Sequence, residues 1–289
     1  RGLNAMFVMM NAARLHVALQ GIGLLDSAWQ KADAYAQERR QMRAPGKGKS
    51  AAEADFISEH PAMRRILDSQ RAWIDGGRVL AYSTALELDI LKHHLDATRR
   101  EAAQRWCTLV TPIIKAAFTH QAFYGGSECL QVFGGHGYVR EWGIEQILRD
   151  SRVAMIYEGT NEIQAIDLLV RKVLGDQGRA LATLLDELRA ELRATSSEDS
   201  TATRLANELQ AATAQLLQAC ATAPDHAHWV AGDFLRATTL VLLAWAWERI
   251  AQANTDSQAR WTQPRQALHA WVLPEFAMRL QLLTVRPAA

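Results

Sequence analysis

The sequence predicts an all-α protein with two helical domains. Apolar residues recur three to five positions apart along almost the whole chain, a period typical of helices with one buried face. We find no stretch in which apolar and polar residues alternate as they do in a half-buried strand. The chain has 289 residues but only 7 prolines and 17 glycines, too few for a turn-rich β-protein. At about 150 residues per domain, this length corresponds to two domains.

Three long helices are expected first, over residues 5–40, 61–95 and 99–132. Gly21 and Gly23 lie inside the first helix. Each costs up to about 1 kcal/mol relative to alanine, so we expect a neighbour to approach closely there. Residues 43–50 (RAPGKGKS) read as the following loop because of their Pro, Gly and Lys content. Pro61 suits the first turn of the second helix, and Pro112 is expected to kink or break the third.

Shorter elements follow the third helix. Residues 134–137 (GGHG) form a strong helix-end signal, and a short helix is expected over 143–152. After the sequence IYEGTN, another helix is expected over 162–174. Asn161 is expected to cap this helix, and Gln164 three residues later completes a capping-box pattern.

The sequence GDQG breaks the helical pattern, and we place a domain boundary there, between residues 1–174 and 175–289. Four further helices are expected over 179–194, 201–222, 226–254 and 259–283. Short connections between helices of similar length favour an up-and-down bundle. Five of the nine tryptophans fall in this second domain. Packing is their expected role, because aromatic side chains dominate buried contacts.

Charge argues against nucleic acid as a partner. The chain has 32 Lys and Arg against 31 Asp and Glu, a net charge of +1. This balance excludes a strongly basic nucleic-acid binder. Residues 176–289 contain ten arginines, no lysine and twelve acidic residues, so the second domain is not basic in bulk either.

The cysteines and the hydropathy of the chain indicate where in the cell the protein is expected. Cys107, Cys129 and Cys220 have no metal-like spacing, and a sparse, odd set fits packed thiols in a reducing compartment. The longest apolar run, residues 238–247, is about half as long as a bilayer span. No signal peptide is visible. We therefore expect a cytoplasmic protein that does not enter the membrane.

Glu158 is the first candidate for chemistry. It follows the apolar run VAMIY, directly precedes Gly159 and lies just before a helix start. A carboxylate among apolar side chains is suited to proton abstraction near neutral pH. The adjacent glycine would let a substrate approach the backbone closely. The alternative is that Glu158 is simply an acidic residue near a helix N-terminus, where the positive end of the helix dipole stabilises a negative charge. The spacing alone leaves both interpretations open.

The GGHG sequence at 134–137 also has two interpretations. Backbone N–H groups of a glycine-rich loop can bind a phosphate. The segment also reads as a plain helix terminus, and it lacks the strand-to-helix context of a dinucleotide fingerprint. His136 is expected as a polar turn residue. No second His or carboxylate lies at metal-binding spacing from it, so we expect no metal site.

Two motifs in this region carry a family resemblance. QVFGGHGY and, a short distance on, LRDSRVAMIYEGTNEIQ resemble the C-terminal helical domain of the flavin-dependent acyl-CoA dehydrogenases, in the same order and spacing. NAARLHVALQGIGLLDSAWQKADAYAQERRQ resembles the first helix of that domain, so the resemblance covers about residues 1–174. TLVTPIIKAAFTHQAF and the additional helices look most like the branch that contains 3-methylmercaptopropionyl-CoA dehydrogenase, and the AidB-type relatives are more distant.

The resemblance implies that Glu158 is the catalytic base. It would take the α-proton of an acyl-CoA thioester while hydride leaves the β-carbon for FAD. The Glu158 N–H and a flavin hydroxyl would polarise the thioester carbonyl. Some relatives carry the base on the first helix, where this chain has Ala13, so Glu158 has no rival. The implied activity is α,β-desaturation with electron-transfer flavoprotein as acceptor. The alternative on the same fold is a non-catalytic, nucleic-acid-protecting homologue of the AidB type.

The resemblance also implies a set of binding residues. The FAD contacts match Arg39, Gln131, Gly134, Gly135, Thr160 and Glu162. The acyl-CoA contacts match Asn11, Arg14 and Gly159. The first four of the FAD set would reach the adenosine diphosphate part of a flavin bound mainly by a neighbouring subunit. The resemblance therefore implies at least a homodimer.

The chain departs from the family's pattern in several places. Met42 and Arg43 stand where relatives often have an aromatic residue and a glycine, and Asn11 replaces the Asp of some members. The family's N-terminal helical domain and middle β-domain have no counterpart in these 289 residues, which begin at Arg1. We therefore expect the C-terminal portion of a longer protein, which by itself binds FAD weakly and lacks full activity.

Overall fold

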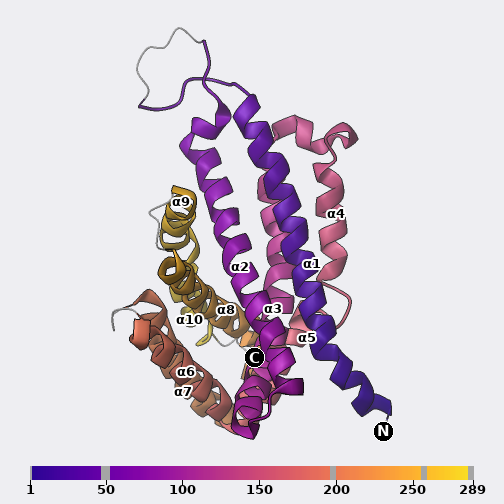
Figure 1. Cartoon of the computed structure of the whole chain (residues 1–289), viewed down its shortest axis with the longest axis vertical. Helices are drawn as coiled ribbons and strands as arrows, with labels where there is room; N and C mark the ends of the chain where they lie inside the picture. The colour runs from indigo at the N-terminus through magenta and orange to yellow at the C-terminus, as the bar shows by residue number, and fades with distance from the viewer. Residues whose placement is uncertain (1, 47–52, 196–199, 255–258, 286–289) are drawn as a thin grey trace.

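The computed structural model describes residues 2–46, 53–195, 200–254 and 259–285, and their regular structure is helical (Figure 1). Extended pairing among these residues is limited to one isolated antiparallel bridge, between Arg40 and Phe56. The bridge closes the long connection after the first helix, where the Ile57 N–H donates to the Arg39 carbonyl at 2.8 Å. The predicted all-α class is confirmed.

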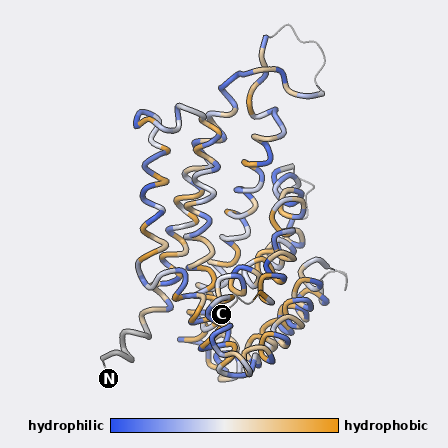
Figure 2. The backbone as a smooth tube through the Cα atoms, turned by 180° about the vertical axis from the view of Figure 1, so that it is seen from behind, coloured by the Kyte–Doolittle hydropathy of each residue, from blue (hydrophilic) through white to orange (hydrophobic). Residues whose placement is uncertain are grey.

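Four helices stand side by side in the taller part of the molecule (Figure 1). They are α1 (Gly2–Glu38), α2 (Pro61–His93), α3 (Ala97–Val132) and α4 (Ile144–Ala154), all close to their predicted bounds. Short hydrophobic and hydrophilic stretches follow one another along these helices, as expected for helices that bury one face (Figure 2). α3 packs against each of the other three, so it forms the centre of the group.

The break expected at Pro112 does not occur, because α3 continues through it. A proline inside a helix leaves the carbonyl of the residue four positions earlier without its usual donor. Here that carbonyl belongs to Thr108, and the Lys172 ammonium donates to it at 2.7 Å. A side chain from another helical segment thus replaces the missing backbone bond.

A loop with the sequence YEGT leads from α4 to α5 (Asn161–Ile166). The helix continues as a π-helical segment, Asp167–Val173, and as a 3-10 turn, Leu174–Asp176. The predicted helix over 162–174 is therefore helical throughout, but its hydrogen-bond pattern changes along its length. π-Helical turns inside α-helices are frequent near functional sites.

The C-terminal half adds α6 (Arg179–Thr195), α7 (Thr201–Thr222) and α8 (His226–Ala253), close to their predicted bounds. The single helix predicted over 259–283 is wrong. The chain instead forms α9 (Ala259–Ala267), a π-helical turn (Leu268–Val272) and α10 (Glu275–Leu282). Pro274, which lies between the last two elements, has no N–H with which to continue a helix.

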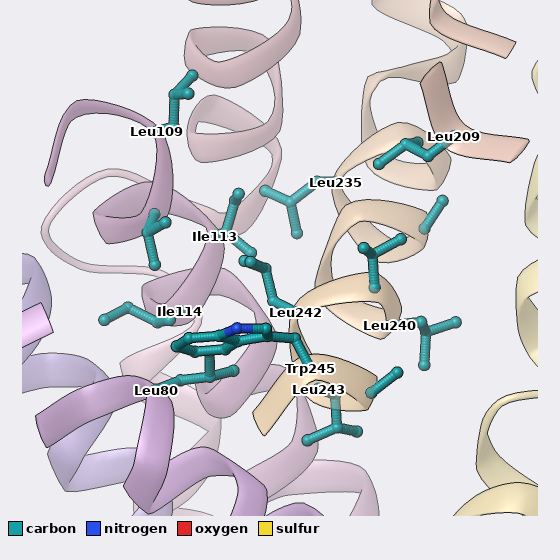
Figure 3. Close-up of a cluster of buried hydrophobic side chains, with 14 of the residues drawn as sticks. Leu80, Leu109, Ile113, Ile114, Leu209, Leu235, Leu240, Leu242, Leu243 and Trp245 are labelled. Carbon is teal, nitrogen blue, oxygen red and sulfur yellow. The ribbon is translucent and has the colours of Figure 1, made fainter. Parts of the chain in front are cut away.

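One hydrophobic core joins both halves of the chain. Figure 3 shows side chains of α2, α3, α7 and α8 in it, among them Leu80, Leu109, Ile113, Ile114, Leu209, Leu235, Leu240, Leu242, Leu243 and Trp245. α8 is long and apolar enough to cross a membrane, but most of its apolar stretch is buried in this core. Its Trp247 indole N–H donates to the Ala72 carbonyl of α2 at 2.9 Å. The boundary proposed at residue 175 thus separates segments that share a core.

Cys107, Cys129 and Cys220 are buried and form no disulfide. Burial raises the pKa of Cys107 and of Cys129 to about 12, so neither side chain ionises near neutral pH. Cys220 is 8% exposed and packs in the core shared by the two halves. The expectation that these residues serve as small packed side chains is confirmed.

Gly21 and Gly23 give a matched test of close helix packing in α1. A Cβ atom on Gly21 would lie 2.6 Å from the Phe118 carbonyl oxygen of α3, whereas one on Gly23 would meet no atom within 4 Å. The expected close approach is therefore confirmed at Gly21 and wrong at the exposed Gly23.

We expect Gly21→Ala to lower the free energy of unfolding by roughly 1–3 kcal/mol, because the two backbones would be forced apart. Gly23→Ala should raise it by up to about 1 kcal/mol, because alanine favours the helix. Urea unfolding of the two variants measures both effects. Equal shifts in the two variants would contradict this account of the α1–α3 contact.

Candidate active site

The loop that carries Glu158 has an unusual backbone. Glu158 has φ 57° and Gly159 has φ 81°, so two successive residues lie in the left-handed region. For a residue other than glycine this conformation costs about 1–2 kcal/mol. Residues held in such conformations often belong to functional sites, where the surrounding structure enforces them.

Buried side chains hold the carbonyl groups of this loop. The Gln164 amide donates to the Glu158 carbonyl at 3.0 Å and to the Gly159 carbonyl at 3.2 Å. The Lys115 ammonium of α3 donates to the Gly159 carbonyl at 2.8 Å and to Asn161 Oδ1 at 3.2 Å. Gln164 and Lys115 are both fully buried, so the two carbonyls point toward the interior.

The loop N–H groups take the opposite direction. In a trans peptide the N–H points away from the carbonyl of the same unit, so Gly159 and Thr160 direct their N–H groups away from the interior. Within the described part of the chain, the N–H groups of Glu158, Gly159 and Thr160 have no acceptor. Successive N–H groups of this kind form a concavity suited to a negatively charged oxygen.

The cap of α5 differs from the expected one. The Thr160 hydroxyl accepts from the Ile163 N–H at 3.3 Å, so Thr160 is the N-cap residue and the cap predicted at Asn161 is wrong. The Asn161 side chain is engaged by α3 instead. Its Oδ1 accepts from Lys115 and from the Thr119 hydroxyl at 3.0 Å, and its amide donates to a carbonyl of α3.

The Glu158 side chain is exposed, and the neighbouring Glu162 is exposed as well. The apolar surroundings expected for Glu158 are not supplied by the described residues. Val153 and Ile156, from the apolar run before it, are themselves 52% and 51% exposed. Val153 lies on the side of α4 that faces away from the core and Ile156 lies in the turn after α4, which a run of apolar letters does not reveal.

Sequence reasoning missed the role of Lys115 in this site. Its pKa is lowered to about 8, mainly by burial and also by the Arg14 charge, although Glu162 and Glu158 act in the opposite direction. A signal existed, because Lys115 stands in the otherwise apolar stretch PIIKAAF of a buried helix. A lysine in such a place needs internal acceptors.

The proposed acyl-CoA contacts lie at the start of the same network. Asn11 Oδ1 accepts from the Thr111 hydroxyl at 3.2 Å. Arg14 is buried and forms an ion pair with Asp167 at 3.1 Å. Gly159 is exposed beside Glu158. The structure therefore brings Arg14, the Glu158 loop and Lys115 into one electrostatic neighbourhood.

Four of the proposed FAD contacts line a single groove. Arg39, Gln131, Gly134 and Gly135 surround a space of about 520 Å³, together with Met42, Tyr35 of α1 and Phe133 directly after α3. In its wall, His136 stacks on Trp142 with ring centroids 5.0 Å apart, and its Nδ1 shares a hydrogen bond with the Tyr35 hydroxyl at 2.9 Å. His136 is thus a packed turn residue.

Thr160 and Glu162, the other two proposed FAD contacts, lie elsewhere. The groove is next to the start of α4, whereas the Glu158 loop follows its end (Figure 1). The 11 residues of α4 rise about 1.5 Å each, which separates the two places by roughly 16 Å along the helix. The proposed FAD contacts therefore form two groups. The described residues contain no cluster of three or more His, Cys, Asp or Glu side chains that could hold a metal ion.

The structure is thus a helical domain in which Glu158 stands on a loop held by buried side chains. A separate groove lies near the start of α4. Residues 1–174 match the family model described as acyl-CoA dehydrogenase, C-terminal domain. The chain belongs to the acyl-CoA dehydrogenase family.

Two relatives illustrate the range of similarity. Over 251 residues the chain is 38% identical to 3-methylmercaptopropionyl-CoA dehydrogenase from Ruegeria pomeroyi, which covers 84% of this chain and 42% of that protein. Over 193 residues it is 33% identical to the broad-specificity linear acyl-CoA dehydrogenase FadE5 from Mycobacterium tuberculosis, covering 65% and 31% of the two proteins. The chain thus spans less than half the length of either relative.

Solved structures agree on the fold. An acyl-CoA oxidase from Yarrowia lipolytica superposes with a TM-score of 0.74 at 16% identity, covering 97% of this chain and 46% of that one. An acyl-CoA dehydrogenase from Bacillus anthracis, complexed with FAD, superposes with a TM-score of 0.65 at 17% identity, covering 98% and 53%. The similarity includes α6 to α10, so the additional helices also have structural counterparts.

The buried Lys115 predicts a pH-dependent stability. Its pKa is about 8 in the folded chain and 10.5 ordinarily, so between these values the unfolded chain binds more protons. The contribution of Lys115 to stability therefore rises with pH across this window. Replacing it by methionine removes that contribution.

We expect the unfolding free energy of Lys115→Met minus that of the wild type to become more negative by roughly 2 kcal/mol between pH 7 and pH 9.5. Urea unfolding at the two pH values measures it. The exposed Lys92 provides the control, since Lys92→Met should show no such trend. A difference that does not vary with pH would contradict the assignment of a buried, charged Lys115.

Proposed function

We propose that this chain is the base-bearing portion of an FAD-dependent acyl-CoA dehydrogenase that desaturates an acyl-CoA between its α- and β-carbons. The observation that carries the proposal is the Glu158 loop. There a carboxylate stands beside backbone N–H groups that point away from the interior. A thioester lying on this loop would meet both a base and hydrogen-bond donors.

Each part of the loop has a role in the proposed reaction. The Glu158 carboxylate accepts the α-proton, and the C–H electron pair becomes the second bond between the α- and β-carbons. Negative charge that develops on the thioester oxygen is stabilised by the loop N–H groups, among them that of Glu158. FAD, when bound, accepts the hydride that leaves the β-carbon. Gly159 gives the substrate room near the backbone, and Asn11 and Arg14 complete the proposed acyl-CoA contacts.

The groove beside α4 suits the adenosine diphosphate part of FAD. Arg39 offers a cation and Gln131 an amide, and a Cβ atom on either Gly134 or Gly135 would meet no atom within 4 Å. A phosphate can therefore come close to this backbone. Because this groove and the Glu158 loop lie at opposite ends of α4, we assign them to different flavins.

This assignment requires at least a homodimer. The groove would hold the flavin of a neighbouring subunit, while Thr160 and Glu162 would contact the flavin next to Glu158. The relative from Ruegeria pomeroyi supports 3-methylmercaptopropionyl-CoA or another short or medium acyl-CoA as substrate. Electron-transfer flavoprotein as electron acceptor and the cytoplasm as location complete the proposal.

Glu158→Gln tests the proposed base. The amide keeps the size of the side chain but cannot accept the proton, so we expect kcat to fall by roughly 10²–10⁴-fold. Loss of flavin absorbance on mixing with acyl-CoA, in the protein expressed from its complete reading frame, measures the rate. Glu101→Gln, an exposed change on α3, should leave it unchanged.

Two results would contradict the proposal. Desaturation that survives in Glu158→Gln would exclude Glu158 as the base. A flavin that no acyl-CoA reduces, in a protein that binds duplex DNA with a steep salt dependence, would instead support the nucleic-acid-protecting alternative.

Gly135→Leu tests the proposed cofactor groove. The added side chain would enter open space rather than the core, so we expect unchanged thermal unfolding but at least a tenfold weaker retention of FAD. The ratio of flavin to protein absorbance after gel filtration measures this. Gly23→Leu adds the same side chain to an exposed position on α1 and serves as the control. Equal flavin content in both variants would place the cofactor elsewhere.

A further inference from the structure

Among the described residues, no carboxylate lies within hydrogen-bonding distance of the Lys115 ammonium. It donates instead to the Gly159 carbonyl at 2.8 Å and to the Asn161 side-chain oxygen at 3.2 Å. Burying a cation with only neutral acceptors costs free energy. A functional role would explain why this chain keeps such a cation. The acceptor here belongs to the peptide unit that follows the proposed catalytic base.

The bond fixes the direction of that peptide unit. Because the peptide is planar, holding the Gly159 carbonyl toward α3 turns the Thr160 N–H toward the opposite side. A charged donor on the carbonyl also polarises the unit, which makes its N–H a stronger donor. Gln164 holds the preceding unit in the same sense through the Glu158 carbonyl. The two bonds together maintain the left-handed backbone at Glu158 and Gly159.

We propose that Lys115 is a positioning residue of the reaction, whose charged ammonium holds the Gly159 carbonyl inward so that the loop N–H groups face the substrate oxygen. The inference rests on the proposed desaturation and adds to it a residue on a different helix from the base. Lys115 acts through the backbone and does not itself take the proton.

The charge state of Lys115 links this role to pH. The charged groups around it are Arg14 of α1, Glu158 of the loop and Glu162 of α5. The pKa of Lys115 lies at about 8, mainly because of burial, so the ammonium loses its proton just above neutral pH. The neutral amine is a weaker donor, and the positioning of the loop should weaken as pH rises through 8.

Lys115→Met is a suitable test because both acceptors of the ammonium keep another donor in the variant, so we expect it to fold. The Gly159 carbonyl keeps the Gln164 amide as a donor, and Asn161 Oδ1 keeps the Thr119 hydroxyl. Methionine is also close to lysine in length and suits an apolar surrounding. Lys92→Met on the surface of α2 is the matched control.

Three measurements on the flavin-loaded protein distinguish positioning from a merely structural role. We expect Lys115→Met to lower kcat at least tenfold at pH 7 with less than a threefold change in KM. We expect the kcat of the wild type to fall near pH 8, and this step to be absent from the variant. The infrared stretching band of a ¹³C-labelled thioester carbonyl in bound enoyl-CoA should lie at lower frequency in the wild type than in the variant.

Hydrogen exchange gives a readout that requires no acyl-CoA. The Asn161 N–H donates to the Met155 carbonyl and closes the loop. Its exchange should be at least tenfold faster in Lys115→Met, with no change in amides of α2. If the wild type fails to oxidise acyl-CoA but the exchange effect is present, the proposed function is wrong, whereas the structural role of Lys115 in holding the loop is correct. The inference about Lys115 would be overturned if the variant had the same kcat, the same fall in kcat near pH 8 and the same exchange rate as the wild type.

Discussion

The polar groups in the middle of α3 must find their partners inside the protein, because residues 109–119 are all buried. The Thr111 hydroxyl donates to Asn11 of α1, and Lys115 and Thr119 donate to Asn161 at the start of α5. Each of these acceptors lies in a segment that carries proposed site residues. The hydrogen-bonding requirement of one central helix thus brings α1 and α5 into register around the Glu158 loop.

A second constraint is the small number of carboxylates available to buried cations. Arg14 of α1 and Lys172 of the π-helical segment both pair with Asp167, at 3.1 and 3.0 Å. Burial lowers the pKa of Lys172, while Asp167 stabilises its charged form. Removing one partner of such a buried pair typically costs about 3–5 kcal/mol. The segment directly after the loop is therefore firmly tied to α1, which limits how far the loop can move.

The sequence predicts the helices well because periodicity is a local property. It also directs attention to Glu158 and to the glycine-rich segment before α4, because both stand in recognisable motifs. It fails where a tertiary partner decides the outcome. Asn161 has the sequence of a capping residue, but α3 engages its side chain and Thr160 takes the cap. Pro112 should interrupt α3, but Lys172 supplies the missing donor.

Lys115 and the exposure of Glu158 are further examples of the same limit. A lysine within apolar neighbours is visible in the sequence, but its acceptors lie 44 and 46 residues away. The apolar run before Glu158 looks like a buried surrounding, yet Val153 at the end of α4 and Ile156 in the turn after it are more than half exposed. In both cases the periodicity gives the helix correctly, while the direction of one side chain depends on which elements pack around it.

The C-terminal helices contribute to this geometry although none of the proposed site residues lies in them. α5 has only six residues, too few to be stable as an isolated helix, and it is held between α3 and α8. α8 is fixed in turn, because its Arg236 guanidinium lies 4.4 Å from the Trp73 ring of α2 and pairs with Glu275 of α10 at 2.8 Å. A rearrangement of α8 would therefore reach Glu158 through α5. The conformation of the base loop is a property of the whole core, including helices beyond the matched family domain.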